Sequence, residues 1–425
     1  MSNQMFADIR ALACLFVFWK LLLLCIAYAS PGPGYDTSTN LLLLRAQSAQ
    51  SENTLLAHLA KNLVSKVVRW DALYFISVAQ RGYLFEQEWA WGWGYTRLLS
   101  LVSKVIPGAA LSPLYAQAYA GVIISHVAHL SSVIILYGLV HHLPIMDKKQ
   151  RRKVAFVAAS LHVFSTAGLF LSAPYSESLF SMLNFLGVLL HARIPWEMPL
   201  EKYGPFSLLS LLLSGACFGL ATTVRSNGLF SGLVYFHHVY MLFHSRINLR
   251  TIVTIVVIGI SAAMILSGML FPQNVGFLRY WTVSNIPLFL LALPMLFVLI
   301  STGLTAPSLW FEQQGLDRKK DYDHTMVYIS CLALPQILLA LLALTTFHVQ
   351  IVNRIATGYP IWYIVLAAAI VSPSRAFEDG KVGRSQFERI TNFFSGPATQ
   401  ELIFRGMIMY SIIQGGLYAS FMPPA

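Results

Sequence analysis

The sequence predicts an all-α polytopic membrane protein, and three observations support this prediction. First, 56% of the 425 residues are hydrophobic and only 11% are charged, with a mean hydropathy of +0.62, above the range of soluble domains. Second, apolar runs of about 20 residues, the length of a bilayer-crossing helix, recur along the whole chain. Third, no soluble domain separates these runs. We therefore expect one integral membrane module over residues 1–425.

The apolar runs predict about eleven transmembrane helices. Their ranges are 11–30, 115–141, 154–172, 177–192, 206–223, 228–243, 251–271, 286–303, 327–346, 359–373 and 402–420. The first run could instead be a signal peptide, because residues 27–29 read Ala-Tyr-Ala, but its length favours an anchor. In such an anchor Lys20 is expected to extend its side chain to the interface.

Residues 31–114 form a long segment after the first run, and we expect amphipathic helices in it. Asp71 opens one of them, with Trp70 and Tyr74 on its apolar face. An Asp at this position could cap the helix, because its side chain can satisfy free backbone N–H groups. It could equally act as a general base for an alcohol near the membrane surface.

A second acidic motif lies further along the same segment. Glu86 and Glu88 are set among tryptophans in F-E-Q-E-W-A-W, residues 85–91. Carboxylates beside aromatic rings suit sugar binding, whereas an aromatic belt at the membrane interface would need no such role. Both interpretations stay open from the sequence.

The distribution of Lys and Arg predicts which loops face the cytoplasm. One set of alternate loops holds seventeen basic residues, mostly in short loops, and the other holds ten, seven of them in the segment 31–114. Cytoplasmic loops carry the excess of Lys and Arg, and long segments cross largely regardless of charge. The segment 31–114 is therefore expected on the opposite, lumenal side.

The unusual polar motifs all fall on this lumenal side. They are R-W-D-A-L-Y-F (69–75), F-E-Q-E-W-A-W (85–91), A-P-Y-S-E-S (173–178), V-R-S-N-G (224–228), L-R-Y-W (278–281) and H-V-Q-I-V-N-R (348–354). A transporter is expected to place its charges near mid-membrane, often in two related halves. Polar groups at span ends on one side, without an internal repeat, favour an active site at one face instead.

Three arginines, Arg225, Arg279 and Arg354, are the basic residues of the short lumenal loops. Membrane insertion does not require them there, although a single arginine could extend to lipid headgroups. A guanidinium can hold phosphate oxygens with two parallel hydrogen bonds, so a lipid-linked phosphate fits them. His348 and Gln350 precede Arg354 in the same motif and add polar groups to it.

Several other classes of protein are excluded. The net charge of +11 is not concentrated on an exposed domain, so no nucleic-acid partner is expected. The four cysteines and twelve histidines show no metal-ligand spacing, so we expect no metal. The Q-E-L-I-F-R-G stretch (400–406) is similar to an intramembrane protease motif. It has Gln400 where that motif has the first of two acidic residues, and it lacks the later histidines. Glu401 and Arg405 are expected to pair within a helix.

In this order, the motifs resemble those of the GPI mannosyltransferase II (PIG-V) family, members of the GT-C superfamily. The resemblance extends over nearly the whole chain and includes R-Y-W-T-V-S-N-I-P and the C-terminal Q-G-G-L-Y-A-S-F-M-P-P-A. Family members usually read I-P-N-F where this chain has Ile286-Pro287-Leu288-Phe289, so any polar role of that Asn is absent here.

This resemblance implies a GT-C fold in the endoplasmic reticulum membrane, with a lumenal active site. It implies dolichyl-phosphate mannose as donor and a mannosyl-glucosaminyl-phosphatidylinositol acceptor, to which a second mannose is added through an α-1,6 linkage. It also implies a small membrane subunit in some species. We expect no metal or other cofactor. The alternatives are a flippase for lipids or lipid-linked sugars, and a GT-C enzyme with another acceptor.

The family's aspartate in the first lumenal segment corresponds to Asp71, which we expect to act as general base. Transfer from a β-mannosyl phosphate to an α linkage is an inversion, which needs one carboxylate to deprotonate the acceptor and positive groups for the phosphate. The expected substrate-binding residues are Arg69, Trp70, Tyr74, Glu86, Glu88, Glu177, Arg225, Asn227, Arg279, His348, Gln350 and Arg354.

Overall fold

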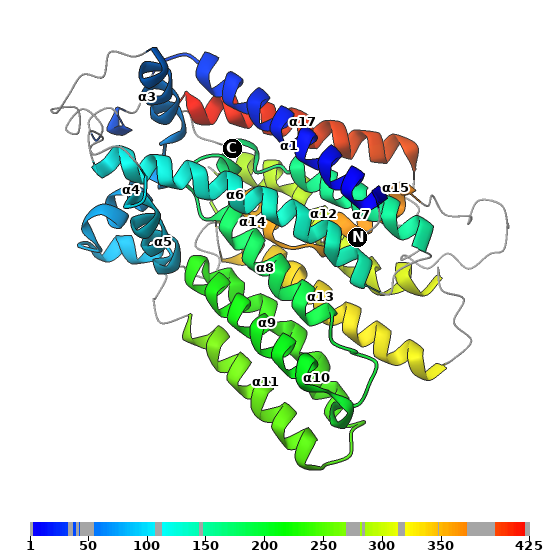
Figure 1. Ribbon diagram of the computed structural model, residues 1–425. Coiled ribbons are helices and arrows are strands. Elements are labelled where there is room, and N and C mark those ends of the chain that lie inside the picture. Colours follow the sequence, from blue (N-terminus) through cyan, green and yellow to red (C-terminus); the bar gives the residue numbers. More distant parts are fainter. Residues whose placement is uncertain are drawn as a thin grey trace.

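Long helices that run side by side form the body of the molecule, and a group of short helices lies at one end of them (Figure 1). The computed structural model describes residues 3–32, 37–39, 42, 55–106, 113–143, 148–268, 281–282, 285–312, 319–346, 348–371 and 396–420. Within these residues the regular structure is helical throughout, with no strand. The predicted all-α class is therefore confirmed.

The helices differ widely in length. The α-helices are α1 (Asn3–Ala29), α3 (Leu55–Val67), α4 (Asp71–Arg81), α5 (Trp93–Ser103), α6 (Pro113–His142), α7 (Lys148–Val163), α8 (Glu177–Ala192), α9 (Pro205–Val224), α10 (Phe236–Leu242), α11 (Leu249–Ser267), α12 (Ile286–Glu312), α13 (Lys319–Thr345), α14 (Val352–Ile355), α15 (Ile361–Val371) and α17 (Pro397–Ala419). The 3₁₀ helices are η1 (Glu86–Ala90), η2 (Gly168–Leu171), η3 (Leu200–Lys202), η4 (Ser226–Tyr235), η6 (Val349–Ile351) and η7 (Ala356–Gly358).

Six helices of the described chain are long and apolar enough to cross a membrane. They are α1, α6, α9, α11, residues Ile286–Pro307 of α12 and residues His324–Thr345 of α13. A seventh span results if Val349–Gly358 and Ile361–Val371, which meet at a bend of 75°, count as one. The chain is thus a multi-pass membrane protein.

The predicted number of eleven spans is not confirmed, although every predicted run overlaps a helix. The run 154–172 is interrupted, because α7 ends at Val163 and a separate 3₁₀ turn follows. The run 228–243 is divided between η4 and α10, and α8 has only 16 residues. Average apolarity over 20 residues does not reveal such interruptions, since the interrupting residues are themselves mostly apolar.

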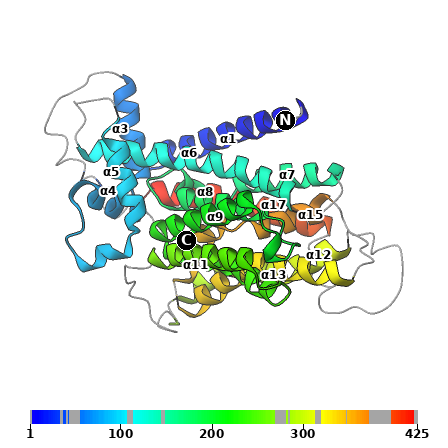
Figure 2. The same cartoon turned by 60° about the horizontal axis from the view of Figure 1, so that its bottom comes forward.

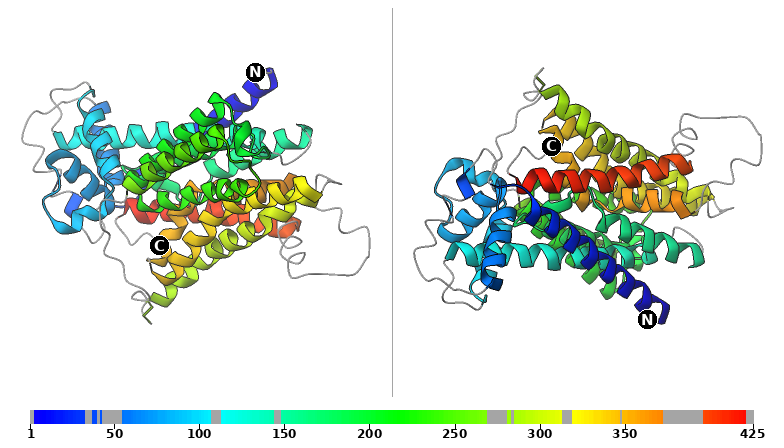
Figure 3. Two further views of the ribbon diagram at one scale, coloured as in Figure 1. Left: turned by 90° about the horizontal axis from the view of Figure 1, so that it is seen from below. Right: turned by 90° about the horizontal axis from the view of Figure 1, so that it is seen from above.

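The long helices pack as a series of neighbours. α6 packs against α7 and α8, α8 against α9, and α9 against α11, while α12 packs against α13 and α15. α1 and α17 come from opposite ends of the chain and lie in contact along one face (Figure 3). Chain segments that are distant in sequence are therefore brought to the same ends of the bundle.

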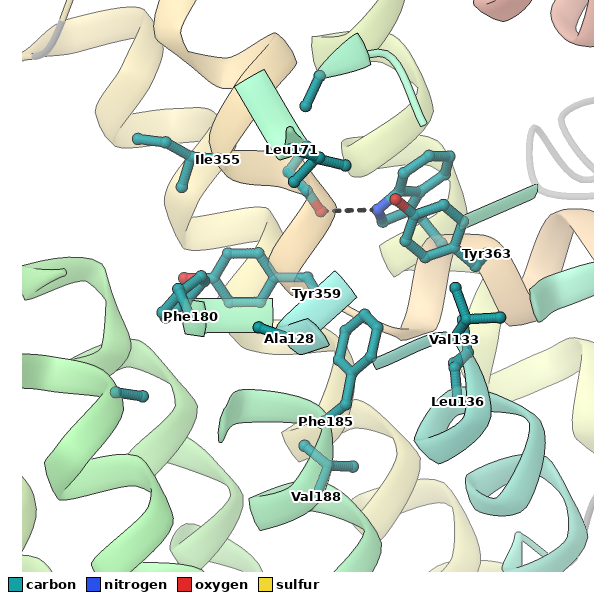
Figure 4. Close-up of a cluster of buried hydrophobic side chains, with 14 of the residues drawn as sticks. Ala128, Val133, Leu136, Leu171, Phe180, Phe185, Val188, Ile355, Tyr359 and Tyr363 are labelled. Atoms are coloured by element: carbon teal, nitrogen blue, oxygen red, sulfur yellow. Dashed lines mark hydrogen bonds between the residues drawn. The ribbon is translucent and has the colours of Figure 1, made fainter. Parts of the chain in front are cut away.

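Buried apolar side chains from α6, α8 and α15 meet in the centre of the bundle (Figure 4). The rings of Phe185 of α8 and Tyr363 of α15 make an edge-to-face contact there, with ring centroids 6.5 Å apart. Gly358, just before the 75° bend, allows the backbone to approach the Phe180 ring, because a Cβ there would lie 2.1 Å from a ring carbon. The bend therefore depends on glycine at this position.

Lys20 points into the bundle, so the expectation that it extends to the interface is wrong. Its side chain is 3% exposed, and its Nζ donates hydrogen bonds to the Leu171 carbonyl at 2.8 Å and to Ser172 Oγ at 2.9 Å. Leu171 is the last residue of η2, where a helix leaves carbonyl groups without an intrahelical partner. The amine satisfies that carbonyl and ties α1 to the segment that leads into α8.

The two ends of the bundle differ in character. At one end, Arg152 of α7 pairs with Asp8 of α1, with 2.6 Å between Nε and Oδ2, and both helices carry basic residues nearby. At the other end lie α3, α4 and α5 (Figure 2). Lys66 of α3 joins this end to the last turn of α1, donating to the Ser30 carbonyl at 2.9 Å. The acidic and aromatic motifs therefore lie away from the basic end.

Candidate active site

An ion pair joins the start of α4 to the short helix α14. Arg354 Nη1 donates a hydrogen bond to Asp71 Oδ2 at 3.1 Å, although 283 positions separate the two residues in sequence. The Asp71 side chain is 26% exposed and that of Arg354 is 14% exposed, so the pair lies at the edge of the packed interior. The predicted general base and a predicted phosphate-binding arginine are thus in direct contact.

A second carboxylate, Glu177 at the start of α8, joins two arginines to each other. Its Oε1 lies 2.9 Å from Arg225 Nη1 and 3.7 Å from Arg354 Nε, and the side chain is buried. We call Asp71, Glu177, Arg225 and Arg354 the charged cluster. Two carboxylates and two guanidinium groups balance each other, which makes their burial tolerable.

Aromatic rings support the charged cluster from one side. The Arg354 guanidinium lies 4.6 Å from the centroid of the Phe170 ring and 5.5 Å from that of Tyr175. Such contacts attract the cation and leave its N–H groups free to point at acceptors. Phe170 was not expected at the site, because it lies in an apolar run whose pattern carries no functional signal.

Asp71 is not the N-cap of α4, so the capping interpretation is wrong. Trp70 occupies that position, and no side chain caps this helix end by a hydrogen bond. Trp70 has φ 52° and ψ −122°, the one positive φ among the described non-glycine residues. A backbone in such a region costs about 1–3 kcal/mol and typically marks a functional site. The Asp71 carboxylate is directed at Arg354 instead of at the helix backbone.

The two predicted acidic residues of η1 have different environments. Glu88 is buried, pairs with Arg81, and accepts hydrogen bonds from the backbone N–H groups of Leu84 at 2.9 Å and Phe85 at 3.2 Å. The hydrogen bonds from Arg81, followed by those backbone groups, lower the pKa of Glu88 to about 2. Glu86 is exposed. Glu88 therefore closes the loop after α4, and the two carboxylates do not form one unit.

Aromatic side chains on α4 and on the loop that follows it pack against one another. Tyr74 stacks on Trp91 with ring centroids 5.2 Å apart, and the Trp91 ring meets the edge of Phe75 at 5.4 Å. Tyr74 is 40% exposed, so one side of this stack is open. Flat apolar rings beside polar groups are a surface to which a sugar can bind.

The other predicted binding residues differ in their burial and in their contacts. Asn227 exchanges two hydrogen bonds with the Tyr359 hydroxyl, at 3.1 and 2.9 Å, and thereby joins η4 to the start of α15. Arg69 is buried in the turn before α4. His348 is exposed at the start of η6, and Gln350 follows within that helix. Arg279 lies outside the described residues.

The chemistry that this arrangement can perform follows from its groups. A carboxylate at the edge of the bundle can accept a proton, and two guanidinium groups beside it can hold an anion. Within the described part of the chain no group of His, Cys, Asp and Glu could hold a metal ion. Such groups at one end of a helical membrane bundle suit an integral membrane transferase.

Comparison with known proteins agrees with this class. A family model described as mannosyltransferase (PIG-V) matches residues 9–273 and 272–425. The chain belongs to this family of mannosyltransferases and is a glycosyltransferase. The GPI mannosyltransferase 2 of Aspergillus oryzae is 35% identical, covering 98% of this chain and 96% of the relative. That of Aspergillus fumigatus is 34% identical, covering 98% and 93%.

Among solved structures, an oligosaccharyltransferase from Archaeoglobus fulgidus in the apo form is similar to this chain. The TM-score is 0.45 at 12% identity, with 96% of this chain and 57% of that chain covered.

Proposed function

We propose that this protein transfers a mannose from dolichyl-phosphate mannose to the GPI-anchor precursor, as the second mannose and through an α-1,6 linkage. The reaction takes place at the lumenal face of the endoplasmic reticulum membrane. Membership of the mannosyltransferase family supports the chemistry, and the names of the two Aspergillus relatives support the acceptor. A GT-C fold is consistent with the helical bundle.

The proposed reaction is a single displacement with inversion. The acceptor hydroxyl oxygen attacks the anomeric carbon of the donor mannose, and its proton passes to Asp71. The bond between that carbon and the phosphate oxygen breaks, and dolichyl phosphate leaves as an anion. Arg354 and Arg225 hold this phosphate, so the leaving group needs no general acid. The apolar faces of the helices bind the dolichyl chain in the bilayer.

The observation that carries the proposal is the contact of 3.1 Å between Asp71 and Arg354. In this contact the guanidinium of Arg354 occupies a carboxylate oxygen of Asp71. A donor phosphate that takes hydrogen bonds from Arg354 would weaken this pair and release the Asp71 carboxylate to accept a hydrogen bond from the acceptor hydroxyl. Donor binding would therefore prepare the base for the acceptor.

Product analysis tests the proposed function. The purified protein is incubated with dolichyl-phosphate mannose and a defined mannosyl-glucosaminyl-phosphatidylinositol, and the product is examined for a new α-1,6 mannoside. Movement of lipid across the bilayer without a new glycoside would indicate a flippase, and transfer to another lipid-linked acceptor would change the assigned substrate. Activity in microsomes that is lost on purification would indicate a required subunit.

The role of Arg354 has a separate test. With donor at limiting concentration, Arg354→Ala should transfer far less mannose than the wild type, because the phosphate loses a bidentate partner. Arg405→Ala is the matched control, since Arg405 pairs with Glu401 at an exposed site outside the charged cluster. Full transfer by Arg354→Ala would exclude Arg354 as a phosphate ligand.

A further inference from the structure

Two buried tyrosine hydroxyls converge on one backbone carbonyl just before Asp71. The Tyr175 hydroxyl donates to the Arg69 carbonyl at 3.2 Å. The Tyr418 hydroxyl lies within donating distance of the same carbonyl, at 3.2 Å, and of the Val67 carbonyl, at 2.8 Å. Both side chains are fully buried. Tyr175 precedes α8 and Tyr418 lies near the end of α17, so three distant parts of the chain meet here.

The Tyr175 hydroxyl also fixes the other side of Trp70. The backbone N–H of Asp71 donates to this hydroxyl at 3.1 Å. One phenol therefore holds the carbonyl before Trp70 and the N–H after it, which fixes the peptide groups on both sides of its unfavourable φ of 52°. A strained backbone persists only where surrounding contacts determine it, and these hydrogen bonds supply such contacts.

The rings of the same two tyrosines support the partner of Asp71. The Phe170 ring lies 4.9 Å from the Tyr175 ring and 5.0 Å from the Tyr418 ring. The guanidinium of Arg354 lies over Phe170 and Tyr175. The group of rings that holds the backbone of Asp71 thus also supports Arg354.

We propose that Tyr175 and Tyr418 are positioning residues that hold the backbone at residues 67–71 so that Asp71 faces the reacting hydroxyl of the acceptor. This inference rests on the proposed function, because it assigns the tyrosines a role through Asp71. The tyrosines themselves donate to backbone carbonyls and are not expected to touch substrate. The C-terminal Q-G-G-L-Y-A-S-F motif, which contains Tyr418, gains a function in this way.

The test removes the hydroxyls and keeps the rings. Tyr418→Phe and Tyr175→Phe should each lower kcat roughly 10- to 100-fold, the cost of a misplaced catalytic group, with the donor KM unchanged because Arg354 keeps its aromatic support. Tyr203→Phe is the matched control. Tyr203 is buried in the connection from η3 to α9 at the far end of the bundle, and its hydroxyl has no hydrogen-bond partner among the described residues. It should retain wild-type kcat.

A double-mutant cycle separates positioning from a general structural role. In an Asp71→Asn background, Tyr418→Phe should cause no further loss of the residual transfer, measured in single turnovers with excess enzyme. A structural role would lower this residual rate by the same factor as in the wild type, and that result would overturn the inference. So would wild-type kcat in both tyrosine variants. A wild-type protein that makes no mannoside would instead refute the proposed function.

Discussion

At the scale of single residues, the proposed mechanism requires one side chain, Asp71, to serve both as an ion-pair partner and as a base. Asp71 meets both demands only if Arg354 can exchange its carboxylate for a donor phosphate. Both side chains are partly exposed, which leaves the pair accessible from the surface of the bundle. By contrast, Glu177 is fully buried and can serve as the fixed counter-ion of both arginines.

Asp71→Asn tests the role of the exposed carboxylate. We expect a loss of transfer of roughly 100- to 10,000-fold, the contribution of a general base, and accumulation of the one-mannose precursor in cells. Because Asp71 makes no capping bond, the helix should form normally. Glu401→Gln, at an exposed carboxylate of α17 that pairs with Arg405, is the control and should keep full activity. Normal turnover by Asp71→Asn would exclude it as the base.

Glu177→Gln tests the buried carboxylate through stability. Removing one partner of a buried ion pair leaves an uncompensated charge and should cost about 3–5 kcal/mol in the free energy of unfolding. Glu401→Gln is the matched control, because Glu401 pairs with Arg405 one turn away at an exposed site, and such pairs contribute about 0.3–0.5 kcal/mol. Thermal unfolding in detergent measures both. Equal losses of unfolding free energy in the two variants would show that burial of the charged cluster does not contribute to stability.

At the scale of the elements, the loop between α4 and η1 depends on Glu88. Its folded-state pKa, about 2, lies below the ordinary value of 4.5, so its contribution to stability is complete above about pH 4.5. The contribution is lost as the pH falls from about 4.5 to about 2, because protonation ends the charged interaction with Arg81. The loop should therefore loosen in acid before the bundle does.

Hydrogen exchange of the amides of Leu84 and Phe85, which bond to Glu88, measures this loosening. Glu88→Gln should reduce their protection at pH 6, and this variant should show no additional loss of protection between pH 4.5 and pH 2. Glu86→Gln should behave like the wild type at pH 6 and throughout the range from pH 4.5 to pH 2, because Glu86 is exposed. Unchanged protection in Glu88→Gln would show that Arg81 and Glu88 do not hold the loop.

The sequence predicted some elements well and others poorly, for physical reasons. Composition and apolar runs were sufficient for the all-α class, since a bilayer imposes helices on such a chain. Breaks such as the one after Val163 depend on tertiary contacts, including the hydrogen bond from Ser411 Oγ to the Ser165 carbonyl at 2.8 Å. Motifs pointed to Asp71, Glu177, Arg225 and Arg354. The C-terminal motif contained Tyr418, but no sequence pattern shows that its hydroxyl bonds to a backbone carbonyl 349 positions away.

At the scale of the whole molecule, the proposed mechanism requires that the charged cluster and the basic loops face different compartments. α8 leaves the cluster at Glu177, and α9 returns to it just before Arg225. The 16 residues of α8 extend about 24 Å, close to the thickness of the hydrocarbon core of about 30 Å. Lys202, in η3 between these two helices, must therefore lie near the opposite surface from Asp71.

Labelling of single cysteines in sealed microsomes tests this sidedness. In a background without the four native cysteines, Lys202→Cys should react with a membrane-impermeant maleimide in intact vesicles, because the excess of basic residues marks its loop as cytoplasmic. Glu86→Cys should react only after the membrane is permeabilised, since it follows α4 at the end that carries Asp71. Both positions are exposed, so lack of reaction reflects the membrane and not burial. Reaction of both in intact vesicles would place the charged cluster on the cytoplasmic side, where the proposed lumenal transfer could not occur.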